Sequence, residues 1–270
     1  MQIRIATTGM ELWKIEHEFT NVPHVHDNWL QVTVPIQGTC HFTHERREYA
    51  LQEGCALVQH PHEEHHFRTA GGAGVIIIQL QTDIWTGGVA PAPELSLRQY
   101  VDPHDIRSRF RGWTGRLLAS DPVDPIAQQE TEADIVAYLH HALRGNIRPA
   151  EADMPTVRQR TGDPHLARVL DYIHTHYRSA LTLDELAALA LQSRYHFIRS
   201  FKASVGMSPY QYVLRVRIEE AKHKLKTSNM TIVDISVYVG FSSTSQLHRA
   251  FLNAVGMSPE LYRSRMRVGG

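Results

Sequence analysis

The sequence predicts a multi-domain α+β protein, in which an N-terminal antiparallel β-barrel with two following helices precedes a C-terminal all-α domain. Three observations predict this architecture. β-rich runs interrupted by glycine occupy the first 85 residues, a helical pattern begins after Pro103, and a repeat with a spacing of 50 residues occupies the end of the chain. With 270 residues, the chain has room for two domains.

Residues 1–100 have the composition of short strands. The runs rich in Val, Ile, Leu and Thr are 30–36, 39–43, 55–59 and 75–81. They are separated by turn glycines at Gly38, Gly54, Gly71 and Gly72. Short strands with a turn about every 8–12 residues are typical of a small antiparallel barrel or jelly roll. We therefore assign residues 1–100 to a small β-barrel domain.

Residues 101–145 are predicted to form a helical pair, at about 105–119 and 125–144. The second helix places an apolar stripe along one face, made of Ile126, Ile135, Val136, Leu139 and Leu143. An exposed amphipathic pair is most simply a dimer interface, and the alternative is that it packs back onto its own barrel. Residues 146–162 are rich in Pro, Gly and polar side chains without periodicity, which predicts a linker.

Residues 163–270 contain an internal repeat. The run Phe-Lys-Ala-Ser-Val-Gly-Met-Ser-Pro-Tyr at 201–210 returns as Phe-Leu-Asn-Ala-Val-Gly-Met-Ser-Pro-Glu at 251–260. Two copies are too few for a solenoid and indicate a duplicated unit whose halves do the same physical job.

Each copy carries the signals of two short helices joined by a tight turn. In the first copy Thr182 and Glu185 can form a capping box, Ser193 can cap a second helix, and Gly206 ends it. The second copy repeats these signals at Thr231, Asp234, Gly240, Ser243 and Gly256. The predicted helix-turn-helix units are therefore 182–204 and 231–254. A helix-turn-helix lays its second helix in the major groove of DNA.

Several runs in this region are specific enough to indicate a family. They are Ser193-Arg-Tyr-His-Phe-Ile-Arg-Ser-Phe-Lys202, Gly206-Met-Ser-Pro-Tyr210, Gly240-Phe-Ser-Ser-Thr-Ser-Gln-Leu-His-Arg-Ala-Phe251 and Gly256-Met-Ser-Pro259. With them, residues 163–270 resemble the DNA-binding domain of the AraC/XylS family of bacterial transcription regulators. Leu191 departs from the pattern, because the family often has Gly in the first turn. If this position needs a positive φ, Leu costs about 1–2 kcal/mol and the first unit either turns differently or is less stable.

Helical phase predicts which side chains of the second helices face DNA. Phe197 and Phe201 in the first copy, and Leu247 and Phe251 in the second, are four residues apart and are assigned to the core. The predicted DNA-binding residues are Arg194, Tyr195, Ile198, Arg199, Lys202, Thr244, Ser245, His248 and Arg249. The resemblance implies base contacts at Tyr195, Ile198 and Arg199. The alternative for Arg199 and Arg249 is that they are framework arginines paired within the domain.

Charge is distributed unevenly although the net charge is zero. Residues 163–270 hold 14 Lys and Arg against 8 Asp and Glu, whereas residues 1–162 hold 14 against 20. A positive domain is consistent with phosphate contact. The two cysteines, Cys40 and Cys55, fit a reducing compartment and are interpreted as small core residues. No apolar run approaches the ~20 residues of a membrane span and no signal segment opens the chain, so we expect a cytoplasmic protein.

Nine of the 18 histidines lie between His17 and His66. His24-Val-His26, followed by Gln31 and later by His66, resembles the two motifs of the cupin family, with Gly38 and Gly54 as its turn glycines. The resemblance implies a divalent metal (Zn, Ni, Fe, Mn or Cu) held by His24, His26, Gln31 and His66. Gln31 departs from the family's Glu and is a poorer ligand. The alternatives are a metal-free pocket for an organic effector and a purely structural histidine cluster.

We therefore expect a cytoplasmic, dimeric DNA-binding transcription regulator that is not an enzyme. Its cupin-like domain senses a small molecule or metal ion and controls promoter occupancy. The resemblance implies operator DNA, an effector and RNA polymerase as partners, with no membrane partner. The alternatives are a cupin metalloenzyme that carries a DNA-binding module, and a DNA-binding dimer that responds to no ligand.

Overall fold

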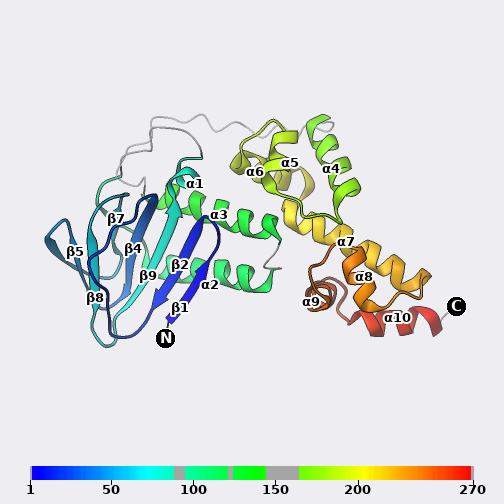
Figure 1. Cartoon of the computed structure of the whole chain (residues 1–270), viewed down its shortest axis with the longest axis horizontal. Coiled ribbons are helices and arrows are strands. Elements are labelled where there is room, and N and C mark those ends of the chain that lie inside the picture. Colours follow the sequence, from blue (N-terminus) through cyan, green and yellow to red (C-terminus); the bar gives the residue numbers. More distant parts are fainter. Residues whose placement is uncertain (1, 88–94, 121–123, 144–163, 269–270) are drawn as a thin grey trace. The chain divides into compact units, whose positions relative to one another are not determined.

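The computed structural model describes residues 2–87, 95–120, 124–143 and 164–268 (Figure 1). The chain divides into two compact units. One unit comprises Met1–Gly115 and Asp134–Asp153 and contains the strands; the other comprises Arg116–Ala133 and Met154–Gly270 and contains the repeat. Helices α2 (Pro103–Ala119) and α3 (Pro125–Leu143) form the predicted helical pair, and each contributes residues to both units. The predicted linker, 146–162, lies outside the described residues.

The strand unit consists of two antiparallel sheets. The larger has the order β1-β2-β9-β4-β7-β10 and the smaller the order β3-β8-β5-β6. The strands are β1 Gln2–Ala6, β2 Met10–Ile15, β3 Phe19–Thr20, β4 Trp29–Gln37, β5 Cys40–His44, β6 Arg47–Leu51, β7 Cys55–Gln59, β8 His65–Thr69, β9 Gly74–Gln81 and β10 Arg98–Tyr100, and a short helix α1 (Thr82–Thr86) follows β9. The four predicted runs are confirmed as β4, β5, β7 and β9.

The interior face of these sheets changes from apolar to polar along the strands. An apolar cluster includes Leu57 of β7, Ile77 of β9, and Phe42 and Phe67 of the smaller sheet. Gln59 and Gln79 follow two residues later on β7 and β9, and therefore point to the same side of the sheet. One end of the interior is thus packed with hydrocarbon and the other is lined with hydrogen-bonding groups.

The two cysteines lie in different environments. Cys40 is fully buried among the apolar residues of the interior, whereas Cys55 is exposed at the start of β7. The interpretation of both cysteines as core residues is therefore correct for Cys40 and wrong for Cys55.

The helical unit repeats one arrangement twice along a central helix (Figure 1). Its helices are α4 Pro164–His176, α5 Leu183–Leu189, α6 Arg194–Val205, α7 Pro209–Thr227, α8 Ile232–Tyr238, α9 Thr244–Val255 and α10 Pro259–Val268. Helix α7 joins the two halves, because Val213 packs in the core of the first and Leu225 in the core of the second. Among the described residues, no helix has both the length and the apolar character needed to cross a membrane.

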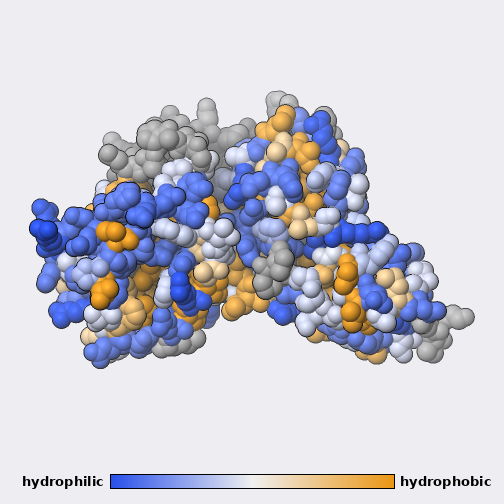
Figure 2. All heavy atoms as spheres, in the orientation of Figure 1, coloured by the Kyte–Doolittle hydropathy of each residue, from blue (hydrophilic) through white to orange (hydrophobic). Residues whose placement is uncertain are grey.

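The outer side of α8 is apolar. Val233 and Val237 are 58% and 68% exposed, although Ile235 between them is fully buried. Hydrophobic residues are accordingly visible on the surface over α8 in Figure 2. This side of α8 is therefore not used by the core of the second helix-turn-helix.

Candidate functional site

The predicted helix starts of both helix-turn-helix units are confirmed. Thr182 accepts a hydrogen bond from the Glu185 backbone and forms a capping box with it, and Thr231 does the same with Asp234. Ser193 and Ser243 cap the second helices, α6 and α9. Both α6 and α9 end at a glycine in the left-handed region. The local sequence therefore sets where each recognition helix begins and ends.

The two turns have the same backbone geometry, although one contains leucine and the other glycine. Leu191 has φ of 53° and Gly240 has φ of 92°. After α5, the Gln192 N–H donates to the Ala187 carbonyl at 3.0 Å; after α8, the Phe241 N–H donates to the Ser236 carbonyl at 2.9 Å. Both are the wide hydrogen bond of a Schellman motif, which requires a left-handed residue. The first unit therefore turns as the second does, with a strained leucine at the turn.

On α6, the core and the exposed side are divided as predicted. Phe197 and Phe201 are buried, while Tyr195, Arg199 and Lys202 are exposed. The Arg199 guanidinium lies 5.7 Å from the centre of the Tyr195 ring. Ile198, which was assigned to the DNA side, is half-buried and packs against the core. The exposed side of α6 presents one aromatic and two cationic side chains.

Arg194, the first residue of α6, has a different environment. Its guanidinium lies 2.6 Å from a carboxylate oxygen of Asp184 on α5 and makes a second, longer contact of 4.0 Å with Glu132. It is thus held across the turn by carboxylates of its own unit. Arg194 was predicted to bind DNA, but this placement is that of an arginine that stabilises its own domain.

On α9, three of the four predicted DNA-binding residues contact their own protein. Thr244 lies 3.4 Å from the Ser236 hydroxyl, His248 lies 2.9 Å from Glu260, and Arg249 donates to the carbonyls of Leu118 and Ala119 at 3.1 and 3.3 Å. Ser245 and Arg249 are exposed, and Thr244 and His248 are half-buried. The second recognition helix therefore has more of its polar side chains engaged than the first.

A buried ion pair in this unit was not anticipated from the sequence. Arg217 of α7 is 3% exposed, donates to the Tyr177 and Ser179 carbonyls, and lies 3.1 Å from Asp124. Its phase was a usable signal, because Arg217 is four residues from both Val213 and Ala221 on the buried side of α7. Its role is structural.

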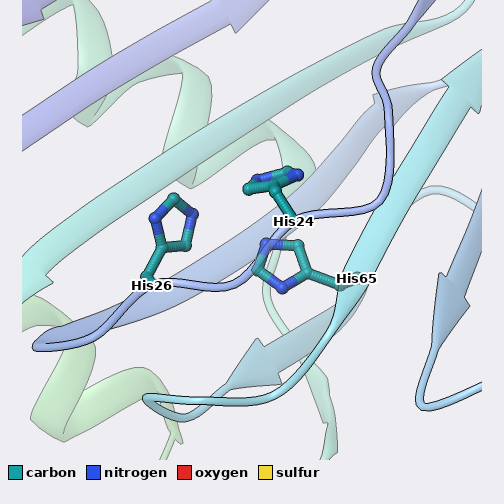
Figure 3. A group of neighbouring side chains, drawn as sticks. All are labelled: His24, His26 and His65. Atoms are coloured by element: carbon teal, nitrogen blue, oxygen red, sulfur yellow. The ribbon is translucent and has the colours of Figure 1, made fainter.

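In the strand unit, the structure brings His24, His26 and His65 together (Figure 3). One ring nitrogen from each lies within 4.8 Å of the others. His24 and His26 precede β4, and His24 is joined to His65 at the start of β8 by two backbone hydrogen bonds of 3.1 and 3.0 Å. The cluster therefore depends on pairing between segments about 40 residues apart.

One of the four predicted metal ligands, His66, is not part of this cluster. His66 follows His65 on β8, and successive strand residues point to opposite sides, so the buried His65 joins the cluster and the half-buried His66 does not. Gln31 is 2% exposed, and its side chain lies beside that of His26 and hydrogen-bonds to the amides of Gln59 and Gln79. The motif selected His66 rather than His65, because the sequence does not show which of these two successive strand residues points to the cluster.

Two of the histidines are held in a defined orientation by backbone carbonyls. The Nδ1 atoms of His24 and His65 are each 2.9 Å from a backbone carbonyl, those of Val22 and Glu63. Nδ1–H donation to a carbonyl leaves the Nε2 lone pair available. Burial, assisted by the nearby His24 and His26, lowers the pKa of His65 to about 4. Burial also lowers the pKa of His26.

These neutral imidazoles fit a divalent metal. The His65 Nε2 atom is buried and has no hydrogen-bond partner among the described residues. Leaving a buried polar atom unpaired is unfavourable, so this lone pair indicates a missing partner. Three converging imidazole nitrogens, two of them on rings fixed by an Nδ1 contact to a backbone carbonyl, are what Zn, Ni, Fe or Cu accepts from a protein.

A row of buried amides extends from the cluster across three strands. Gln79 donates from Nε2 to His26 at 3.1 Å and to the Gln31 Oε1 atom at 2.7 Å. Gln31 in turn donates to the Gln59 Oε1 atom at 2.9 Å and to Thr33 at 3.1 Å. The strand register explains the row, because Gln31 of β4 lies opposite both Gln59 of β7 and Gln79 of β9.

Comparison with known proteins agrees with this geometry. Residues 13–131 match the family model described as an AraC-like ligand binding domain, and residues 186–265 match a helix-turn-helix domain. The chain is 24% identical over 253 residues to the uncharacterized HTH-type transcriptional regulator YobQ of Bacillus subtilis, covering 92% of each chain. It is 32% identical over 134 residues to the MmsAB operon regulatory protein of Pseudomonas aeruginosa, covering 49% of this chain and 44% of that one.

One solved structure is similar to part of the chain. The DNA-binding domain of AdpA, in complex with a target DNA, is 32% identical, covers 40% of this chain and 96% of that chain, and has a TM-score of 0.38. The two matched regions contain most of the strands and the duplicated helix-turn-helix, respectively. The chain therefore contains a region similar to the AraC-like ligand binding domain and a helix-turn-helix domain, and the relatives that it resembles are transcriptional regulators.

Proposed function

We propose that the protein binds operator DNA with α6 and α9 in neighbouring turns of the major groove, and that a ligand in the cupin-like domain controls this binding. The observation that carries the proposal is the exposed side of α6, opposite the buried Phe197 and Phe201. Helix α7 has 19 residues, or about 28 Å, which suits two recognition helices one DNA turn apart.

Specific recognition is assigned chiefly to α6. Arg199 can donate two hydrogen bonds to a guanine edge, Tyr195 can contact a base or phosphate, and Ile198 can pack on a thymine methyl group. Lys202 is suited to a phosphate. On α9, Ser245 is exposed and faces the DNA directly, whereas Thr244, His248 and Arg249 exchange a protein contact for DNA.

Substituting one arginine tests the assignment. Arg199→Ala should weaken binding to a selected operator by about 10- to 100-fold, since a bidentate base contact is worth about 1–3 kcal/mol, and should leave binding to random DNA nearly unchanged. Arg168→Ala is the matched control, because Arg168 is an exposed arginine of α4 rather than of a recognition helix. Fluorescence anisotropy at constant salt measures both. Equal losses on operator and random DNA would demote Arg199 to a phosphate contact.

We also infer that His24, His26 and His65 hold one divalent metal. When bound, the metal supplies a positive charge and a coordination site for a small molecule. The three imidazoles are held in place by the backbone carbonyls of Val22 and Glu63 and by Gln79. Elemental analysis of tag-free protein and of a His24→Ala/His26→Ala variant tests the site. Metal in equal amounts in both would contradict it.

The remaining assignments follow from the resemblance to AraC-like regulators. We infer a homodimer, contact with RNA polymerase at the promoter, and a cytoplasmic location. The apolar stripe predicted for α3 is not an exposed dimer surface, because Ile126, Ile135, Leu139 and Leu143 are buried within the chain itself. We also infer that the cupin-like domain binds its ligand without transforming it, since the relatives named above are regulators. Sedimentation measures whether the protein is a homodimer. Turnover of a bound ligand would favour the metalloenzyme alternative.

A further inference from the structure

The histidine cluster contains no carboxylate among the described residues. Gln31, in the position where the cupin resemblance implies an acidic ligand, is neutral, and its Oε1 atom accepts a hydrogen bond from Gln79 at 2.7 Å. The three imidazoles are neutral ligands as well. A divalent ion held by this chain alone would therefore keep its full charge.

The nearby carboxylates have other partners. Glu63, two residues from His65, accepts hydrogen bonds from His44 at 2.9 Å and from the His60 backbone at 2.7 Å. Glu11 binds Arg4 and the Trp13 indole. Asp27 is exposed and lies 3.8 Å from His62. None of these three carboxylates belongs to the group of converging ligand atoms.

The charge of a bound metal determines which kind of ligand can complete its coordination. A bound divalent cation is the largest local charge in its surroundings, and an uncompensated charge is costly where water is scarce. His65 is 1% exposed, and His24 and His26 are half-buried. Three protein ligands leave at least one coordination position open on a metal such as zinc. An anion with an oxygen donor fills that position and compensates the charge.

A second observation also indicates an oxygen atom from outside the chain. Gln59 is 1% exposed, and its Oε1 atom accepts from both Gln31 and Thr33, at 2.9 and 3.2 Å. These two donors fix the direction of the amide, and its Nε2 atom has no partner among the described residues. A buried N–H group without an acceptor is unfavourable. The polar end of the interior therefore contains a buried N–H group that can donate a hydrogen bond to an oxygen atom of a ligand.

We propose that the effector of this regulator is a small carboxylate anion, which coordinates the histidine-bound metal with its own oxygen in place of the acidic ligand that Gln31 does not provide. The proposal rests on the metal site and on the regulatory function proposed above. Selectivity for an anion comes from the metal, while the amide row supplies neutral hydrogen bonds to the rest of the molecule.

Cobalt provides a direct test on the full chain. Metal-free protein is loaded with Co²⁺, whose visible absorption reports coordination, and is titrated with acetate and, as an uncharged probe of the same shape, with acetamide. Acetate should change the spectrum saturably, at a concentration at least about tenfold lower than acetamide, because only acetate compensates charge. No response to acetate, or equal responses to both probes, would overturn the proposal.

A variant of equal size sharpens the test. Gln31→Glu places a carboxylate beside the cluster, so Co²⁺ should bind more tightly and the response to acetate should weaken by about tenfold or more. An unchanged acetate response in a folded Gln31→Glu protein would contradict the charge argument. If this variant does not fold, the comparison of acetate with acetamide on the wild type decides alone.

The outcomes separate this proposal from those on which it rests. Absence of Co²⁺ binding overturns the metal site and the carboxylate effector together, while operator binding, measured without metal, continues to support the DNA-binding assignment. Co²⁺ binding without an anion response overturns the carboxylate effector only.

Discussion

Leu191 allows the backbone of the first helix-turn-helix to be tested by the sign of a stability change. Its φ is 53°, in a region that costs a non-glycine residue about 1–2 kcal/mol. The side chain is 76% exposed, so little packing is lost when it is shortened. Leu191→Ala keeps the strain and is the reference. Leu191→Gly removes the strain but loosens the unfolded chain, at a cost of about 0.4–1 kcal/mol.

The difference between the backbone strain and the cost of loosening the unfolded chain predicts the relative stability of the two variants. The Leu191→Gly variant should be more stable than the Leu191→Ala variant by about 0.5–1 kcal/mol, whereas in a helix interior Gly is less stable than Ala by about 1 kcal/mol. Unfolding of the helical unit can be followed by circular dichroism. All four tryptophans, Trp13, Trp29, Trp85 and Trp113, lie in the strand unit, so their fluorescence follows that unit separately.

The equivalent position of the second copy supplies the opposite change. A Cβ atom on Gly240 would lie 2.7 Å from the Arg178 carbonyl oxygen, in addition to the strain at φ of 92°. Gly240→Ala should therefore destabilise the helical unit by at least about 2 kcal/mol. A Leu191→Gly protein that is less stable than the Leu191→Ala protein would refute the left-handed turn at Leu191, whatever the result at Gly240.

Two further predictions concern a buried charge and the cysteines. Asp124→Ala should destabilise the helical unit by about 3–5 kcal/mol in denaturant unfolding, because it leaves the buried Arg217 without its carboxylate. Asp184→Ala, at the exposed pair with Arg194, should cost at most about 1 kcal/mol. Similar losses of stability in the two variants would contradict the difference in burial between the two ion pairs. Burial raises the pKa of the Cys40 thiol to about 12. At pH 8 one thiol per folded chain, that of the exposed Cys55, should therefore react with iodoacetamide, and both thiols should react after unfolding. Two rapidly reacting thiols in the folded protein would contradict the burial of Cys40.

Local signals in the sequence predicted much of the helical unit. Capping residues such as Thr182 and Ser193, and the four-residue spacing of Phe197 and Phe201, act within one or two helical turns, so they can be read without knowledge of the fold. The same holds for the four predicted strands. The partner of Arg194 could not be predicted in this way. Whether its guanidinium is free to contact DNA or pairs with Asp184 depends on how α5 and α6 pack against each other.

The strand unit shows where such reading ends. Gln31 and His66 were expected to bind a metal; the structure replaces His66 with His65 and places Gln31 in a row of amides beside His26. Gln59 and Gln79 carried no signal in the sequence, since they are 28 and 48 residues from Gln31. Only the antiparallel register of β7, β4 and β9 places the three side by side.

The sequence by itself therefore determined the division into a strand part and a duplicated helical part, the helix-turn-helix units and the core side of each recognition helix, because short-range propensity and periodicity govern these features. The tertiary structure alone decided which histidines converge, which amide lacks a partner and which arginine is buried against Asp124. The physical reason is that pairing between distant segments depends on strand register and helix packing, and a shift of one residue in a strand turns every side chain to the other face.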